Sequence, residues 1–234
     1  MQIPEKESLE LSIIMPCLNE ENTVGLCVDE AGEFIRKYCI HGEILVVDNA
    51  SADASAEIAR KHGARVITEE KRGYGNAIRA GIAGSKGRVL IIGDCDTTYD
   101  FLHLEEIYQP LAEEKCQMVM GNRYAGGIEA GGMSWSHRWG VRFLSLCARM
   151  RFHMEVYDFH CGLRGILRSA AEQLEFRTEG MEFATEMIAK AGKSNFCILQ
   201  VPVVLRKCKQ ERKSKLRTIR DGLRHLGYIL RGDL

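Results

Sequence analysis

The first half of the chain alternates short, almost wholly apolar runs with amphipathic stretches. The apolar runs, each expected to form a buried strand, lie at 11–15, 43–48, 65–68, 88–93 and 116–120. The stretches between them predict helices at 20–38, 55–62, 73–82 and 102–114. Nearly continuous Val, Ile and Leu strands that alternate with helices indicate an α/β fold, with a mainly parallel sheet and helices on both faces.

The second half of the chain is less regular. It predicts helices at 136–151, 182–191 and 215–230, of which the last is basic, and a strand at 198–205. Pro202 lies inside that strand and has no N–H to donate, so we expect the strand at an edge of the sheet. A chain of 234 residues without a clear linker favours a single domain over 1–234.

Polar side chains follow the predicted strands of the first half. They are Asn19, Glu20, Asp48, Asp94, Asp96 and Arg123. In a parallel sheet the carboxyl ends of the strands meet at one rim, and ligands bind there. The sequence therefore predicts a binding site at this rim.

Asp94 and Asp96 stand two residues apart at the end of the fourth predicted strand. Two carboxylates at this spacing can converge on one hard cation, Mg²⁺ or Mn²⁺, which in turn bridges a diphosphate and stabilises its departure. Two solvated acids in a turn are the alternative interpretation. The buried strand before them and the other polar rim positions favour the metal site.

Two further rim segments allow either a structural or a ligand-binding interpretation. Asp53 could cap the helix that follows it, whereas Asp48 has no such structural explanation. The turn at 73–77 has the sequence Gly-Tyr-Gly-Asn-Ala, so its backbone at Gly75 could approach a donor closely, or it could simply start a helix.

Charge and cysteine content narrow the class of protein. The 32 basic and 32 acidic residues cancel, so the net charge does not indicate nucleic acid, but the segment 206–220 is strongly basic and favours an anionic partner. Nine cysteines without a C-x-x-C pair are expected to be reduced thiols. We find no signal peptide and no apolar run of the length that spans a bilayer, so we expect a cytoplasmic protein.

The rim motifs occur in an order and spacing that resemble glycosyltransferase family 2, whose members have the Rossmann-like GT-A fold. They are Pro16-x-x-Asn-Glu20, Asp48-Asn-x-Ser-x-Asp53, Gly73-x-Gly-x-Ala77 and Asp94-x-Asp96. Three later motifs resemble the polyprenyl-phosphate branch of this family, the dolichyl-phosphate mannose and glucose synthases. They are Gly121-Asn-Arg-Tyr124, Asp158-Phe-His-Cys-Gly-Leu-Arg164 and Gly180-Met-Glu-Phe-Ala-Thr-Glu186.

The resemblance implies a nucleotide-sugar site built mainly from residues 1–124 and an acceptor site built from 125–234. The donor-binding residues that it implies are Pro16, Leu18, Asn19, Glu20, Val46, Asp48, Gly75, Gly93, Asp94, Cys95, Asp96, Thr98, Arg123, Lys209, Arg212 and Lys215. The last three lie in a segment that resembles a phosphate-closing loop, with Lys209 in place of arginine and Arg212 in place of glycine. Thr98 stands where such enzymes often have a third metal contact.

The chemistry that the resemblance implies is inverting transfer of a sugar from a UDP- or GDP-linked donor to a polyprenyl or dolichyl phosphate. The candidate catalytic residues are Asp96, Arg123, Asp158 and Glu182. A turn cap and a surface acid are the structural alternatives for Asp158 and Glu182. We expect Arg164 and Glu186 to pair with each other as a structural link.

An aromatic and apolar stripe on the helix near 135–151 adds a membrane hypothesis. The stripe consists of Trp135, Trp139, Phe143, Leu146 and Met150, beside a stripe of arginines. This pattern suits peripheral contact with the cytoplasmic face of a membrane or a groove for an isoprenoid chain, and packing on the protein's own core is the alternative. A membrane-anchoring partner protein, or a second copy of the chain in a homo-oligomer, is another candidate to contact this stripe.

Two other functions remain open from the sequence. The same enzyme class could act on a saccharide, a protein or a small molecule, in which case Asp158 would be needed as a base. A non-catalytic nucleotide-sugar-binding subunit is the less favoured alternative, because the set of acids and bases is complete.

Overall fold

The computed structural model describes residues 9–209 and 218–231, and within them seven strands form one sheet. The strands are β1 (Leu11–Cys17), β2 (Gly42–Asp48), β3 (Arg65–Thr68), β4 (Val89–Ile92), β5 (Met118–Asn122), β6 (Arg164–Leu167) and β7 (Ile198–Pro202). Their order is β3-β2-β1-β4-β6-β5-β7, and β6 runs antiparallel to both of its neighbours. The predicted mainly parallel sheet is confirmed.

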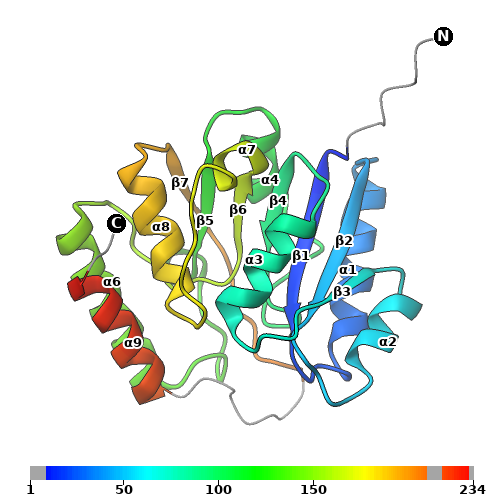
Figure 1. Cartoon of the computed structure of the whole chain (residues 1–234), viewed down its shortest axis with the longest axis horizontal. Helices are drawn as coiled ribbons and strands as arrows, with labels where there is room; N and C mark the ends of the chain where they lie inside the picture. Colours follow the sequence, from blue (N-terminus) through cyan, green and yellow to red (C-terminus); the bar gives the residue numbers. More distant parts are fainter. Residues whose placement is uncertain (1–8, 210–217, 232–234) are drawn as a thin grey trace.

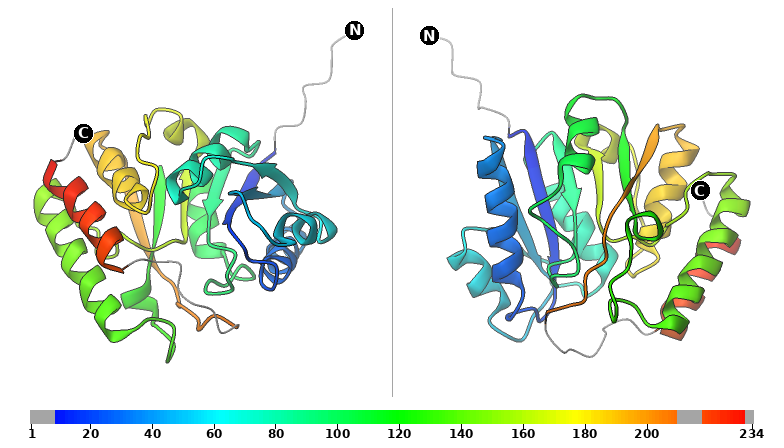
Figure 2. Two further views of the ribbon diagram at one scale, coloured as in Figure 1. Left: turned by 60° about the horizontal axis from the view of Figure 1, so that its bottom comes forward. Right: turned by 180° about the vertical axis from the view of Figure 1, so that it is seen from behind.

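Helices cover both faces of this sheet, as predicted (Figure 1). The described helices are α1 (Val24–Lys37), α2 (Ser55–Lys61), α3 (Tyr74–Gly84), α4 (Glu105–Ala112), α5 (Arg123–Gly126), α6 (Trp135–Phe152), α7 (Arg168–Ala171), α8 (Phe183–Lys193) and α9 (Thr218–Arg231). α1 and α4 share one face, where the rings of Phe34 and Tyr108 meet edge to face at 6.1 Å. α3 lies on the opposite face, as the front and rear views show (Figure 2).

Alternating strand residues form the core on each face. Ile14 of β1 and Val47 of β2 point toward α3, and Gly81 lets that helix approach them closely. A Cβ at Gly81 would lie 2.4 Å from Cγ2 of Ile14, so a larger residue would push α3 off the sheet. Close packing of α3 fixes the position of the turn before it, which reaches the rim of the sheet.

Three local predictions differ from the structure. The four-residue β6 was not predicted, because it begins with a buried arginine and continues with a glycine rather than with an apolar run. Helix α4 begins at Glu105 and not at 102, because Asp100 accepts the N–H of Leu102 in a preceding turn at 3.0 Å. Strand β7 ends at Pro202 instead of 205, and it does lie at the sheet edge, as predicted.

Helices α6 and α9 pack side by side, away from the main sheet (Figures 1 and 2). None of the described helices has both the length and the apolar character needed to cross a membrane. The nine cysteines all lie in the described residues and form no disulfide, which agrees with the expectation of free thiols.

Candidate functional site

The ends of β1 and β4 border a cleft of about 370 Å³, which we call the rim cleft. Pro16 lines it from the end of β1, Leu18 and Glu20 from the loop after that strand, and Asp94, Cys95 and Asp96 from the loop after β4. Six of the predicted donor-binding residues are therefore brought together. Other lining residues were not predicted as site residues from the sequence, namely Asn49, Tyr74, Met181 and Arg224.

Side-chain bonds between two loops hold the first wall of the rim cleft. Asn19 has a left-handed backbone with φ of 51°, donates its N–H to Ser51 Oγ at 2.9 Å and accepts the N–H of Ala52 at 2.7 Å. The N–H of Glu20 donates to Ser55 Oγ at 2.7 Å. Asn19 is thus placed as a link between the loops after β1 and β2, and the structure does not include it in the cleft lining.

Asp53 belongs to the same link. Its carboxylate accepts the N–H of Glu21 at 3.1 Å and the N–H of Ser55, the first residue of α2, at 3.0 Å. These bonds account for both carboxylate oxygens of Asp53, although the N-cap of α2 is Ala54 and not Asp53.

Several other predicted donor residues do not line the rim cleft. Val46 is fully buried in β2, and Asp48 is buried at the end of that strand. At Gly75 an added Cβ would lie 2.4 Å from the carbonyl oxygen of Thr178, and at Gly93 it would lie 2.8 Å from the ring of Phe101. At both positions a larger side chain would clash with protein atoms, so the need for glycine is explained without a ligand.

The carboxylates of Asp94 and Asp96 both line the rim cleft. One oxygen of Asp96 accepts the N–H of Thr98 at 3.0 Å and its hydroxyl, so Thr98 orients Asp96. Asp94 Oδ2 lies so close to Gly162 that a Cβ there would be 2.5 Å away. Burial, with the nearby Asp94 charge, raises the pKa of the Tyr74 phenol well above its usual range.

This pair fits a divalent cation with two hard oxygen ligands from the protein. In the part of the chain that the structure describes, no group of three or more His, Cys, Asp or Glu side chains forms a metal site. The remaining coordination positions of a Mg²⁺ or Mn²⁺ ion would therefore be left to ligand oxygens and water, as is usual for nucleotide-bound magnesium.

A second cavity of about 370 Å³ lies between α6, α8 and α9, and we call it the helical cavity. Its walls are largely apolar, with Val141, Phe143, Leu144, Leu223 and Leu226 among the lining residues. Two arginines and three histidines also line it: Arg123, Arg164, His137, His160 and His225. Tyr74, Asp94 and Met181 line both this cavity and the rim cleft, so the two spaces meet there.

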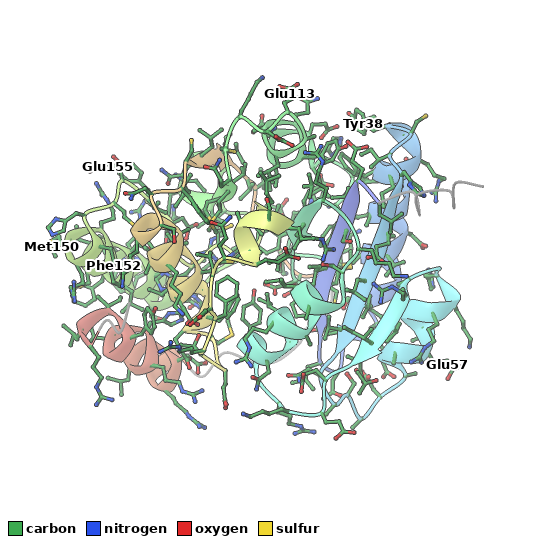
Figure 3. All side chains as sticks on the ribbon, turned by 45° about the horizontal axis from the view of Figure 1, so that its top comes forward. Tyr38, Glu57, Glu113, Met150, Phe152 and Glu155 are labelled. Atoms are coloured by element: carbon green, nitrogen blue, oxygen red, sulfur yellow. The ribbon has the colours of Figure 1, made fainter. Side chains whose placement is uncertain are left out.

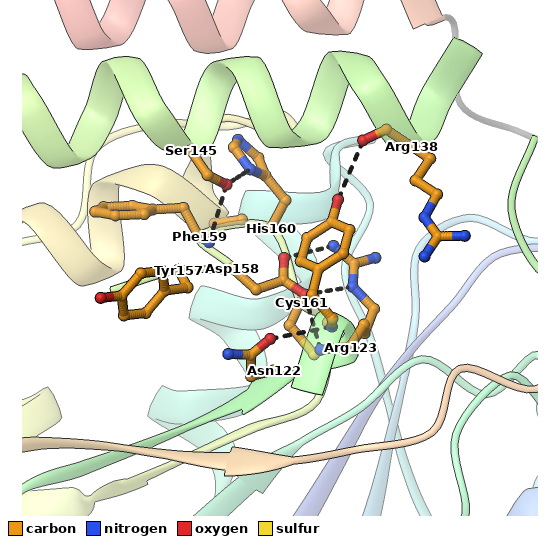
Figure 4. Close-up of polar contacts among 12 residues, drawn as sticks. Asn122, Arg123, Arg138, Ser145, Tyr157, Asp158, Phe159, His160 and Cys161 are labelled. Carbon is orange, nitrogen blue, oxygen red and sulfur yellow. Dashed lines mark hydrogen bonds and ion pairs between the residues drawn. The ribbon is translucent and has the colours of Figure 1, made fainter. Parts of the chain in front are cut away.

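Arg123 and Asp158 form a buried ion pair at the base of the helical cavity (Figure 4). Nε and Nη2 of Arg123 each donate to the Asp158 carboxylate at 2.7 Å, and the backbone N–H of Arg123 donates to it at 3.1 Å. The Asp158 side chain is fully buried. This geometry makes Asp158 a positioning residue for Arg123, and it places Arg123 in the helical cavity rather than in the rim cleft.

Arg164 lines the same cavity and is almost fully buried. It donates to the carbonyl oxygens of Ala184, at 3.1 Å, and of Cys161, while its Nε has no hydrogen-bond partner among the described residues. The expected pair of Arg164 with Glu186 is wrong. Glu186 instead accepts the N–H groups of Arg177 and Thr178 at 2.8 and 2.9 Å.

A chain of polar side chains joins the helices around the helical cavity. Thr185 Oγ1 lies 2.9 Å from His225 Nδ1 and 3.4 Å from His160 Nε2, and Ser145 Oγ lies 3.3 Å from His160 Nδ1. Burial, together with the nearby Arg164 charge, lowers the pKa of His225 to about 4, and burial lowers that of His160. Both imidazoles are therefore neutral at pH 7.

The remaining predicted site residues lie elsewhere or cannot be placed. Glu182 lines neither the rim cleft nor the helical cavity; its carboxylate lies 3.9 Å from Nε of Arg224. The amine of Lys209 lies 3.7 Å from Glu30, and its N–H donates to Thr97 Oγ1 at 3.1 Å. Arg212 and Lys215 lie outside the described residues.

The aromatic stripe on α6 faces outward. Trp135 and Trp139 are 77% and 56% exposed, and Met150 at the other end of the helix is 62% exposed. The label of Met150 marks the outer edge of the molecule (Figure 3). The alternative that this stripe packs on the protein's own core is wrong.

Comparisons with known proteins show the family of the chain. The model of glycosyl transferase family 2 matches residues 12–175. The low-salt glycan biosynthesis hexosyltransferase Agl6 of Haloferax volcanii is 34% identical over 94% of the chain, which spans only 53% of that relative's length. The dolichyl-phosphate hexose transferase of the same organism is 29% identical, over 87% of the chain and 86% of the relative.

The solved structure of glucosyl-3-phosphoglycerate synthase from Mycobacterium tuberculosis, in complex with Mn²⁺ and UDP-glucose, superimposes with a TM-score of 0.76. The match covers 96% of this chain and 78% of that one at 21% identity, so it shows the fold. The chain belongs to glycosyltransferase family 2 and has the GT-A fold, as its motifs predicted.

Proposed function

We propose that this protein transfers a hexose from a UDP- or GDP-linked sugar to a polyprenyl or dolichyl phosphate, with Mg²⁺ or Mn²⁺ held by Asp94 and Asp96. The observation that carries the proposal is that a carboxylate-lined rim cleft and a largely apolar helical cavity meet at Asp94. A nucleotide-sugar donor needs a polar cleft and a lipid acceptor needs an apolar cavity. The two must meet at the point where the sugar is transferred from the donor to the acceptor.

The rim cleft suits the donor. Pro16, Leu18 and Glu20 offer a wall for the nucleoside, and the two aspartates lie where the diphosphate would follow. The bound cation would neutralise the charge that develops on the leaving nucleoside diphosphate. We further propose that residues 1–124 provide most of this donor half and 125–234 most of the acceptor half of one catalytic domain.

The helical cavity suits a phosphate with an apolar tail. Arg164 has no carboxylate partner among the described residues, and its unpaired Nε is a donor that an anion would satisfy. Arg123, already oriented by Asp158, adds a second guanidinium to the lining. The apolar side chains of α6 and α9 would contact the first isoprenoid units.

The attacking group of the proposed acceptor needs no strong base. A phosphate monoester loses its second proton near pH 6, so it is already anionic at neutral pH and does not need a strong general base. Asp158 is buried in its ion pair, and burial lowers the pKa of His160 and His225, which makes both imidazoles weak bases. Positioning and charge stabilisation are then the main sources of rate.

The exposed stripe on α6 supports peripheral contact with a membrane. Trp135, Trp139 and Phe143 are each more than half exposed, and Phe143 also lines the helical cavity. A lipid acceptor could therefore pass from the bilayer interface into the cavity without leaving an apolar environment. Relatives named as a dolichyl-phosphate hexose transferase and a dodecaprenyl-phosphate galacturonate synthase support this acceptor class.

The test supplies a panel of UDP- and GDP-sugars with Mn²⁺ and compares two acceptors that differ in one group, a short polyprenyl phosphate and the corresponding polyprenol. We expect release of nucleoside diphosphate with the phosphate and not with the alcohol. A water-soluble saccharide is supplied as a third acceptor. Release of nucleoside diphosphate with the saccharide and none with the lipid phosphate would reject the lipid acceptor and favour the saccharide alternative. Donor binding without release under any condition would support a non-catalytic role.

A further inference from the structure

Helix α9 contributes side chains to both spaces of the proposed site. Leu223, His225 and Leu226 line the helical cavity, whereas Arg220 and Arg224 line the rim cleft. Residues four apart in the sequence lie on one face of a helix, so the two arginines share a face of α9. The apolar side chains of this helix are accounted for by the lipid acceptor, but the two arginines have no assigned role.

Contacts with the start of α8 place Arg224 at the rim cleft. His225 is 6% exposed, and its Nδ1 lies 2.9 Å from Oγ1 of Thr185 on α8. The Nε of Arg224 lies 3.9 Å from the carboxylate of Glu182. Gly180 leaves room for this pair, because a Cβ there would lie 2.5 Å from Oε2 of Glu182 and 2.7 Å from Nη1 of Arg224. Glu182 does not line the rim cleft, so it can hold Arg224 without occupying the place of a ligand.

The charges in the rim cleft require cations besides the metal. Four carboxylates line the cleft, those of Glu20, Asp94, Asp96 and Asp221. Among the described lining residues, the basic side chains are those of Arg220 and Arg224. A divalent cation and these two guanidiniums together offset the four carboxylates. Without the arginines, a dianionic diphosphate would enter a cleft that is still negative after the metal has bound.

Arginine has the geometry that a diphosphate needs. The planar guanidinium can donate two parallel N–H groups to the oxygens of one phosphate, which fixes the direction of the phosphate as well as its charge. When the sugar leaves, the nucleoside diphosphate gains negative charge. Cations that are already in place stabilise this charge as it develops.

We propose that Arg220 and Arg224 of α9 bind the diphosphate of the donor in the rim cleft, and that Glu182 is a positioning residue that orients Arg224. This inference rests on the proposed function for the identity of the donor, and it does not depend on the acceptor. It makes α9 a part of both the donor site and the acceptor site. It also gives Glu182 a role through Arg224.

The experiment uses the whole chain with Mn²⁺ and measures the dissociation constants of UDP and GDP by calorimetry. Arg220→Gln and Arg224→Gln each remove one guanidinium. For the nucleotide that the wild type binds more tightly, we expect the dissociation constant to rise about tenfold in each variant, the scale of one hydrogen bond to a charged group. Arg224→Lys should recover part of the affinity, because it restores the charge without the paired N–H groups.

Arg231→Gln is the matched control, because Arg231 is an exposed arginine of the same helix that does not line the rim cleft. It should bind the nucleotide like the wild type. Glu182→Gln tests the positioning role and should also weaken nucleotide binding. In a protein that already carries Arg224→Gln, however, Glu182→Gln should cause no further loss, because the two residues act as one unit.

The outcomes separate this inference from the proposed reaction. If Arg220→Gln and Arg224→Gln bind the nucleotide as tightly as Arg231→Gln, the inference is overturned, even if sugar transfer to lipid phosphate is observed. Loss of binding to anionic vesicles with unchanged nucleotide binding would also overturn it, and would assign the arginines to lipid headgroups. Weaker nucleotide binding in both variants supports the inference, even if lipid phosphate is not the acceptor. A wild type that binds neither UDP nor GDP overturns both the inference and the proposed donor.

Discussion

Arg123 and Asp158 meet through two parallel hydrogen bonds of 2.7 Å, and the aspartate side chain is fully buried. The pair joins the end of β5 to the motif that precedes β6, so it fixes the floor of the helical cavity. A guanidinium held in this way keeps its orientation when a ligand binds, which lowers the cost of ordering it.

We expect Asp158→Asn to lower the stability of the protein and to disturb the position of Arg123. The substitution leaves a buried guanidinium without its counter-charge, and removing one partner of such a pair costs about 3–5 kcal/mol. We expect urea unfolding to show a loss of this size, together with a weaker apparent affinity for the lipid phosphate. If Asp158 were instead a general base, the variant would keep its acceptor affinity and lose turnover.

Substitution of the proposed metal ligands should abolish turnover without unfolding the protein. Asp94→Asn and Asp96→Asn each remove a charge that would hold the cation, and we expect kcat to fall by about 100-fold or more. Chelation of divalent cations should have the same effect on the wild type. Asp29→Asn is the control, because Asp29 is an exposed carboxylate paired with His62 at 2.8 Å. Full activity of the metal-free enzyme would contradict this prediction.

The stability of the protein should fall as the pH is lowered from about 6.5 toward 4. Burial lowers the pKa of His225 from 6.5 to about 4 in the folded chain, so in this window the unfolded state binds more protons. Stability therefore rises with pH across the window, and His225 alone accounts for up to roughly 3 kcal/mol.

Denaturant unfolding at pH 7 and pH 5 measures this effect. His225→Gln should be less stable than the wild type at pH 7, because it loses the contact with Thr185 Oγ1 at 2.9 Å, but its stability should depend less on pH. His160 is also buried with a lowered pKa, so some dependence should remain. An unchanged pH profile in the variant would show that His225 is not the titrating group.

Binding to vesicles should depend on the exposed tryptophans of α6. Burial of a large apolar side chain contributes about 1.5–3 kcal/mol, so Trp135→Ser with Trp139→Ser should weaken vesicle binding by roughly 100-fold or more. Leu26→Ser is the control, because Leu26 is also exposed, at 45%, but lies on α1. Sedimentation with vesicles of mixed neutral and anionic lipids provides the measurement. Equal losses in the two proteins would reject a membrane face on α6.

The parts of the fold that the sequence predicted share one physical cause. β1, β2 and β4 are runs of residues buried on both faces, so their apolar character is continuous and their ends can be located. The polar residues after β1 and β4 then had to gather at one rim, and Asp94 and Asp96 do line a common cleft. The apolar pattern along the chain, and the rule that ligands bind at the carboxyl ends of parallel strands, are sufficient to predict this part of the site.

The parts that the sequence did not predict depend on long-range packing. Arg164 and Glu186 lie 22 positions apart with opposite charges, yet each hydrogen-bonds to backbone groups that only the folded chain brings near. Tyr74 looked like part of a turn at the start of a helix, yet it lines both cavities together with Asp94, because α3 packs on β1 and β2. The glycines Gly75 and Gly93 looked like ligand contacts because a sequence does not show which protein segment fills the space beside them.

The most direct measurement of the central claim is anomalous diffraction from Mn²⁺ in crystals grown with a nucleoside diphosphate and a short polyprenyl phosphate. The account predicts one Mn²⁺ peak in the rim cleft, bound by the carboxylates of Asp94 and Asp96 and by the diphosphate, with the lipid phosphate beside Arg164 in the helical cavity. A Mn²⁺ ion bound away from these two carboxylates, or a lipid phosphate outside the helical cavity, would contradict it.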